Sequence, residues 1–468
     1  MENNNVVQIV KERLKKSFDV KYREVLCAKG KITIVFIDNL CNSSFISEYI
    51  IEPLSQVDIT YNNANEIKNR VLYANSVGNV KDINDIFTHI LSGDAVILFD
   101  FFQDILFCEA KGYVRRGVSI PITETVIKGP REGFTEVFVD NISLIRRKIK
   151  NPDLKFESMY VGEKTNTTVV ISYIEGEAPE KLINHIRSKI QGSSYEFILD
   201  TNYIEEVLKE PLTPFDTIGY SEKPDVVASK ILEGRVAVIV DGTPFVITAP
   251  HFFIENFQMP DDYYLNKFFM NITRLLRWAA FLISVVLPGF YIALATYHFS
   301  LIPTVFVFRL AVTRAGVPFP TVIEVLLLYF FFQVSREAGI RLPQPIGQAM
   351  SIVGALILGD ATVGAALASQ STMIVVSVSA ISSFLVPKVY GGAFIWSIII
   401  IILSAMEGLP GFYIGFFMLV AHLSGLKSCG YPYLFPLGSL GEYKYKDLAT
   451  RSKLKEVSKD IYDGDDNS

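Results

Sequence analysis

The chain has 468 residues, 50% of them hydrophobic, and a formal net charge of −5. This length exceeds what one hydrophobic core normally serves, so two or three structural units are expected. The net charge is small for a chain of this size and gives no reason to expect a polyanionic partner, so nucleic acid is excluded as a partner.

Apolar residues are unevenly distributed along the chain. Residues 278–426 contain only nine charged side chains, whereas the sequence up to residue 271 is an ordinary mixture of charged and apolar residues. A water-soluble fold could not cover so much apolar surface, but lipid hydrocarbon can. The sequence therefore predicts an α+β cytoplasmic domain followed by an all-α polytopic membrane domain.

Chemistry-bearing motifs are absent from the sequence. Its four cysteines and five histidines lack metal-ligand spacing, and no HExxH, nucleophile elbow or P-loop occurs. We therefore expect no cofactor, no metal and no enzymatic activity. The polar start, residues 1–5, lacks a basic flank followed by an apolar core, so no signal peptide is expected and the first domain should stay in the cytoplasm.

Two pairs of segments in the soluble half resemble each other. Residues 91–100 align without gaps on 232–241, and residues 32–38 align on 169–175. The first pair reads as a helix closed by glycine, a buried strand and an Asp that begins a hairpin. We predict tandem α/β subdomains, and convergent strand–turn patterning is the alternative.

The predicted organisation has five segments. They are a leader at 1–20, a first α/β subdomain at 20–150, a second α/β subdomain at 151–265, a transmembrane domain at 266–426, and a cytoplasmic tail at 427–468 with a disordered end. Between the repeats, residues 128–134 read as a structural turn and connector rather than a phosphate loop. A helix should follow at 136–150, with Arg146, Arg147 and Lys148 on its polar side.

Seven apolar runs occupy the membrane half: 275–297, 301–312, 319–335, 346–363, 373–386, 393–406 and 411–424. Several are short or contain Gly or Pro, which indicates tilted or broken helices. Lys267 and Arg274 precede the first run, Arg277 lies at its start, and residues 427–459 add lysines after the last run, which predicts cytoplasmic termini. The sequence predicts an even number of crossings, between four and six, with six favoured.

Polar side chains interrupt these runs and are candidates to line an ion or solute path. They are Asp360, Gln348, Gln370 and Glu324. A carboxylate in lipid is costly and tends to face a bundle interior or a water-filled path. The alternative, a structural hydrogen bond, is nearly as plausible from the sequence alone.

Five short motifs are distinctive in combination: Gly129, Pro130, Arg131 and Glu132, then Arg146 and Arg147, then Pro224 and Asp225, then Asp241, Gly242 and Pro244, and finally Arg336 with Glu337. Together they resemble the A subunit of bacterial spore germination nutrient receptors of the GerA type. The resemblance covers about residues 20–440, and its specificity comes from the combination. Lys223 stands where the family usually has arginine.

The resemblance implies a subunit of the spore inner membrane, with both termini cytoplasmic. It further implies a transporter-like B subunit and a lipoprotein C subunit as partners, a small nutrient such as an amino acid acting on the complex, and a homo-oligomer around an ion-conducting pore. The alternative function is a secondary transporter, favoured by the broken helices and an intramembrane Asp. Transporters usually show repeated membrane halves, whereas here the repeat lies in the soluble part.

Overall fold

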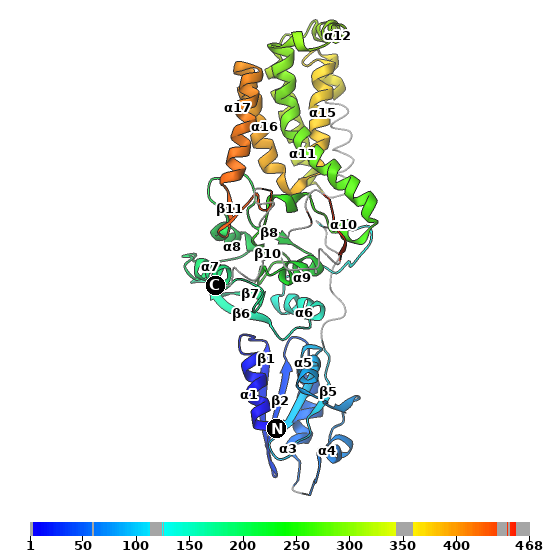
Figure 1. The fold of residues 1–468 in the computed structure, drawn as a ribbon, viewed down its shortest axis with the longest axis vertical. Helices are drawn as coiled ribbons and strands as arrows, with labels where there is room; N and C mark the ends of the chain where they lie inside the picture. The colour runs from blue at the N-terminus through cyan, green and yellow to red at the C-terminus, as the bar shows by residue number, and fades with distance from the viewer. Residues whose placement is uncertain are drawn as a thin grey trace.

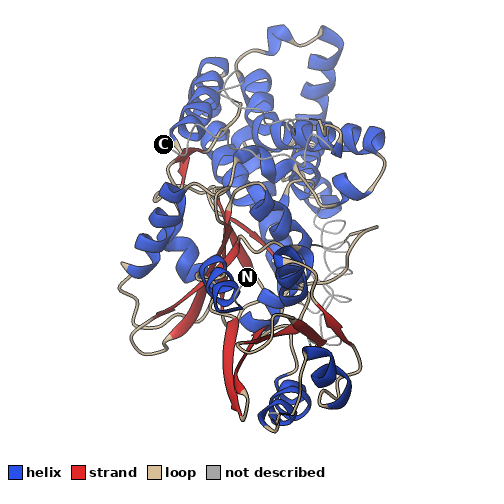
Figure 2. Cartoon of the chain, turned by 60° about the horizontal axis from the view of Figure 1, so that its bottom comes forward, coloured by secondary structure: helices blue, strands red, loops and turns tan. Residues whose placement is uncertain are grey.

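The computed structural model describes residues 3–58, 60–112, 124, 126–342, 359–437, 447 and 450–454. The molecule is elongated (Figure 1): one sheet-containing unit lies at one end, a second lies in the middle, and long helices form the other end. The strands of the two five-stranded sheets lie away from the long helices (Figure 2). The predicted fold class, two tandem α/β subdomains followed by a helical region, is confirmed.

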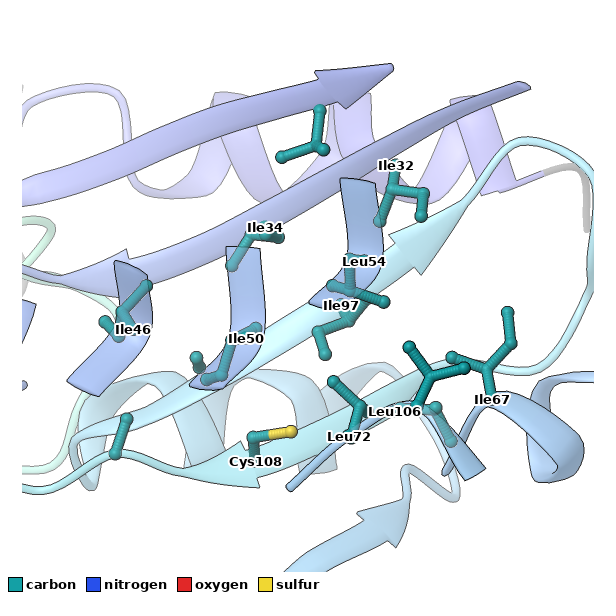
Figure 3. Close-up of a cluster of buried hydrophobic side chains, with 14 of the residues drawn as sticks. Ile32, Ile34, Ile46, Ile50, Leu54, Ile67, Leu72, Ile97, Leu106 and Cys108 are labelled. Carbon is teal, nitrogen blue, oxygen red and sulfur yellow. The ribbon is translucent and has the colours of Figure 1, made fainter. Parts of the chain in front are cut away.

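The first unit is an antiparallel sheet of order β1-β2-β4-β5-β3. Its strands are β1 (Val20–Cys27), β2 (Gly30–Ile37), β3 (Val77–Asn79), β4 (Asp94–Phe99) and β5 (Leu106–Glu109). Helices α1 (Asn3–Arg13) and α5 (Ile83–Leu91) cover one face. The other face packs on α2 (Ser43–Ile46), η1 (Ser47–Ile51), α3 (Glu52–Ser55) and α4 (Ala64–Arg70). Figure 3 shows the core between this other face of the first sheet and its helices, where Ile34 of β2 and Ile97 of the adjacent β4 face Ile50 of η1.

The second unit repeats this arrangement, with sheet order β6-β7-β9-β10-β8. Its strands are β6 (Leu154–Val161), β7 (Thr167–Ile174), β8 (Gly219–Ser221), β9 (Val236–Val240) and β10 (Val246–Ala249). One face packs on α6 (Phe138–Lys148) and α9 (Pro224–Leu232). The other packs on α7 (Glu180–Gln191) and α8 (Thr201–Leu208).

The strand registers of the two units coincide. Ile32 pairs with Phe99 in the first sheet, as Val169 pairs with Val240 in the second. Gly93 and Gly234, which close the preceding helices, have φ angles of 88° and 83°. This left-handed conformation is the one that glycine adopts without a Cβ clash. The predicted superposition of residues 32–38 on 169–175 and of 91–100 on 232–241 is thus confirmed.

Helix α6 belongs to the second unit, although it was predicted to belong to the first. It precedes β6 and packs on the second sheet, just as α1 precedes β1 and packs on the first. The two units therefore meet in the connector rather than at residue 150. The leader likewise contributes α1 to the first core.

The polar side predicted for Arg146 is wrong. Arg146 is fully buried, and its guanidinium makes two 3.1 Å hydrogen bonds to the carboxylate of Asp19 and one to the carbonyl of Leu154. A buried arginine is tolerated only when its charge and donors are matched in this way. The pair ties the end of the leader to α6 and so joins the two units.

The helical region follows residue 266. Its elements are α11 (Lys267–Thr296), η3 (Phe299–Leu301), α12 (Thr304–Arg314), α13 (Thr321–Arg341), α15 (Gln370–Phe384), η4 (Pro387–Val389), α16 (Tyr390–Glu407) and α17 (Leu409–Gly425). Within the described residues, Lys267–Thr296 and Pro387–Glu407 are long and apolar enough to cross a membrane, and α15 and α17 are apolar but shorter. The last two predicted runs stay separate, because the chain turns at Gly408 with a φ of 67°.

The chain then returns to the second unit. Strands β11 (Lys427–Ser428) and β12 (Tyr431–Pro432) form a small hairpin. Cys429 joins the core of the second unit, and the Tyr433 ring joins the core shared with α11 and α16. The predicted disordered end, residues 455–468, lies outside the described residues.

Candidate functional site

The connector between the two units is where several family-motif residues meet. At Gly129, with a φ of +122°, an added Cβ would lie 2.5 Å from the ring of Tyr264. The carbonyl of Pro130 accepts a hydrogen bond from the ammonium of Lys223 at 2.7 Å. The Tyr264 hydroxyl donates to Asp225, and Pro224 begins α9. The connector therefore packs between α9 and α10 (Asp261–Tyr264). Helix α10 immediately precedes the first long helix.

A buried group of charges joins α10, α11 and the C-terminal segment. We call it the arginine joint: Asp262, Arg274, Arg277, Asp447 and Arg451. The Asp262 carboxylate accepts from Arg274 at 3.0 Å and from Arg277 at 2.9 Å. Arg274 also pairs with Asp447, and Arg451 donates to the backbone carbonyl of Asp262. Charges removed from water need such partners, so each member depends on the others.

A second buried pair lies where the second sheet leads into the helices. Arg235, fully buried at the start of β9, pairs with Glu255 in η2 (Phe253–Phe257), and Lys230 lies 3.0 Å from the same carboxylate. Burial opposes ionisation of Glu255, but Arg235 and Lys230 outweigh it and hold its pKa well below the usual range. Glu255 is therefore a charged tether between the sheet and the segment that precedes α10.

A third contact links Glu124, upstream of the connector, to η4 between α15 and α16. Lys388 in η4 lies 3.1 Å from the carboxylate of Glu124. The same carboxylate accepts hydrogen bonds from the Ser221 hydroxyl and from the amide of Glu222 at the end of β8. The Glu124 side chain thus touches both the second sheet and the helical region.

Inside the helical region, Glu324 is the centre of a polar cluster. We define the Glu324 cluster as Glu324, Arg314, Ser369, Thr372 and Tyr291. Glu324 is fully buried, and one of its oxygens accepts from the Ser369 amide at 2.8 Å and the Thr372 hydroxyl at 2.9 Å. Its other oxygen lies 3.7 Å from Arg314 and has no hydrogen-bond partner among the described residues. A buried carboxylate with unused acceptor capacity is unusual.

The other described polar candidates of the helical region do not join this cluster. Gln370 adjoins it at the first turn of α15 but is itself exposed. Asp360 is exposed in a helical stretch at 359–364, and Gln348 lies outside the described residues. A cavity of about 610 Å³ lies between α13 and α15, with Arg336 and Gly359 among its lining residues.

The remaining motif residues have structural partners. Glu132 lies 3.3 Å from Arg147, and Glu337 lies 2.6 Å from Arg341. The Arg336 guanidinium stacks on the ring of Tyr390. Three further motif residues form the turn after β9, where Asp241 accepts from the Phe138 amide and Gly242 donates to the Glu136 carbonyl: Asp241, Gly242 and Pro244. Arg131 is exposed.

Sequence reasoning did not single out Asp262, Asp447 or Lys388 as site residues. A usable signal was the pair Arg274 and Arg277, three residues apart on one face of the first apolar helix. Two arginines on one side of a helix that enters an apolar region require an anion nearby. The acidic pair Asp261–Asp262 just upstream was the available partner.

Comparison with known proteins decides the family. The family model described as Bacillus/Clostridium GerA spore germination protein matches residues 8–460. The chain belongs to the GerA family. It is 38% identical over 455 residues to spore germination protein KA of Bacillus subtilis (strain 168), covering 96% of this chain and 84% of that protein.

Other relatives agree with this assignment. Spore germination protein GerLA of Bacillus cereus is 32% identical, with 92% of this chain and 89% of that protein covered. A membrane protein, YfkQ of Bacillus subtilis (strain 168), is 36% identical, with 90% and 82% covered. Homology thus supports the assignment of this chain as an A subunit of a germinant receptor that acts in spore germination. Membership of the family also suggests a membrane protein.

One solved structure is also similar. It is the crystal structure of the N-terminal domain of the A subunit of the Bacillus megaterium spore germinant receptor GerK3. The match has a TM-score of 0.39 and 29% sequence identity, and it covers 53% of this chain and 94% of that chain.

Proposed function

We propose that this GerA-family chain is the multi-pass membrane subunit of a nutrient receptor, and that it works as an oligomeric ligand-gated ion channel. The observation that carries the proposal is the set of contacts between the second unit and the helical region. The arginine joint and the Lys388–Glu124 pair connect soluble elements to the long helices, and the Glu255 tether fixes the second sheet to the segment that precedes α10. A shift of the second unit would therefore be transmitted directly to α11 and to the start of α16.

The partners follow from the family. We propose a transporter-like B subunit, a lipoprotein C subunit and further copies of this chain as neighbours in the spore inner membrane. A small nutrient such as an amino acid would act on the complex. Lys267, Arg274 and Arg277 at the start of α11 favour a cytoplasmic location for the soluble units, and we propose that both termini lie on that side as well.

The polar side chains of the helical region supply a candidate path for ions. The Glu324 cluster provides a buried carboxylate and several hydroxyl oxygens, and Asp360 and Gln370 present polar groups on exposed helix positions. Oxygen-rich linings of this kind replace part of the hydration shell of a cation. In an oligomer, exposed positions such as Asp360 would face neighbouring copies or a central path.

The coupling contact can be tested by reversing its charges. Lys388→Glu replaces the ammonium that pairs with Glu124 by a second carboxylate and should weaken the link without touching either helix core. We expect normal protein levels but nutrient-triggered germination slowed severalfold, measured as ion release from spores. The double variant Lys388→Glu, Glu124→Lys restores opposite charges but loses the hydrogen bonds that Ser221 and the Glu222 amide make to Glu124, so it should recover part of the rate.

The matched control is Lys189→Glu, an exposed lysine on α7 of the second unit with no ion pair among the described residues. It should leave the rate near that of the wild type. Equal slowing by Lys388→Glu and by the control variant would show that Lys388 and Glu124 do not act as a coupling pair.

A further inference from the structure

A fully exposed leucine lies beside the base of the long helices. Leu212, in the loop between α8 and β8, is 100% exposed and has a φ of +60°. A branched apolar side chain held in the left-handed region and offered to solvent is doubly unfavourable in water. Its neighbour Thr213 lies 3.1 Å from the His422 ring nitrogen, within one turn of the end of α17. The leucine is thus presented at the level where α17 ends.

The first turns of α11 present a second apolar surface at this end of the helices. Phe268, Phe269 and Ile272 are 77%, 61% and 53% exposed. On the opposite side of the same turns, Met270 and Arg274 are buried. The helix therefore has an unpartnered apolar side while its other side is fixed to the soluble domain, as in interfacial amphipathic helices.

Other side chains indicate that a membrane–water boundary lies at this level. Both tryptophans of the chain lie at this level and pack on the protein core, Trp278 stacked on Phe257 and Trp396 buried 5.2 Å from the His422 ring. Tryptophan is enriched at membrane interfaces. Lys267 and Lys427, exposed at the near ends of α11 and α17, would face anionic headgroups.

We propose that Leu212 and the Phe268–Phe269 side of α11 insert into the headgroup–acyl boundary of the lipid leaflet that faces the soluble units. The two surfaces lie on opposite sides of the helices (Figure 1), with the end of α17 on one side and the start of α11 on the other. A single protein partner would cover one side, whereas a bilayer surrounds both. The soluble domain is thereby seated on the membrane surface at two separated points. This inference rests on the membrane insertion assumed in the proposed function.

Site-directed spin labelling of the full chain in liposomes containing phosphatidylglycerol tests this. Cys27→Ser removes the one partly exposed thiol, while burial raises the pKa of Cys41, Cys108 and Cys429 to about 12 and keeps them unreactive. Nitroxides are then placed by single substitutions, Leu212→Cys or Phe268→Cys. Collision with oxygen and with a polar nickel chelate reports depth in the bilayer.

Two reference positions calibrate the result: Tyr160→Cys on β6, 75% exposed, for water, and Ile402→Cys in α16, 47% exposed, for hydrocarbon. We expect the oxygen-to-nickel ratio at 212 and 268 to be severalfold above that at 160 and below that at 402. Values at 212 and 268 equal to that at 160 would overturn the lipid contact, and low access to both reagents there would indicate a protein contact instead. A water-like value at 402 would overturn the proposed membrane insertion itself.

Discussion

Asp262→Asn is expected to cause a large loss of stability at the junction of the soluble and helical regions. Asp262 is fully buried and is the shared anion for Arg274 and Arg277. An asparagine of the same shape keeps one acceptor oxygen but loses the negative charge, so the positive charge of Arg277 is left buried and uncompensated. Breaking a buried pair in this way costs roughly 3–5 kcal/mol. We expect strongly reduced full-length protein in the membrane fraction and a lower melting temperature of what remains.

The adjacent Asp261→Asn is the matched control. Asp261 accepts a hydrogen bond from the Ile127 amide at 3.1 Å and makes no ion pair among the described residues. An asparagine can accept the same bond, so protein level and melting temperature should stay close to those of the wild type. If Asp262→Asn were as mild as Asp261→Asn, the arginine joint would not be what holds the two regions together.

The second large effect is expected at Glu324. Glu324→Leu removes the acceptor for the Ser369 amide and the Thr372 hydroxyl and leaves Arg314 without its anion. Each buried donor left unsatisfied costs about 1–3 kcal/mol, so this variant should accumulate poorly. Glu324→Gln keeps an acceptor for both donors and removes only the charge. We expect it to reach near-normal levels and to slow nutrient-triggered ion release.

The control for this pair is Gln370→Leu, one residue from Ser369 but exposed at the first turn of α15. It should change protein level little. Protein amounts are read by immunoblot of spore membranes, and ion release is measured on the same spores. Normal accumulation of Glu324→Leu would contradict a structural role for the cluster, and unchanged ion release in Glu324→Gln would contradict a role in conduction.

The tandem units were predictable because their signals are local. A glycine that closes a helix, a continuous apolar strand and an Asp that starts a hairpin lie within ten residues, and the pattern occurs twice. The matching registers of β2 with β4 and of β7 with β9 follow from that spacing. The sheet on which α6 packs was harder to predict, because a helix between two repeats can pack on either one.

Two of the buried ion pairs could not be predicted, because their partners are distant in sequence. Arg146 follows an apolar helix pattern whose other basic residues are more exposed, and its partner Asp19 lies in the leader. Asp447 reaches Arg274 only because the chain returns from α17 to the second unit. Periodicity identifies which face of a helix is apolar, but it cannot show that an arginine on the other face meets a carboxylate from a remote segment.

The start of the first long helix shows the same limit. The apolar run begins at residue 275, whereas α11 begins at Lys267. Its first turns contain both exposed phenylalanines and buried arginines, so hydropathy alone underestimates the length of the helix. The burial of the two arginines is explained by their ion pairs with Asp262.

The most direct test of the proposed channel is cation release from spores in which this chain carries Asp360→Asn at the wild-type protein level. Asp360 is exposed on the helical stretch 359–364, and asparagine keeps its shape while removing its charge. If exposed acidic side chains from several copies line a cation path, release after addition of a triggering nutrient mixture should slow severalfold. An unchanged rate of cation release, with the protein present at the normal level, would contradict the account.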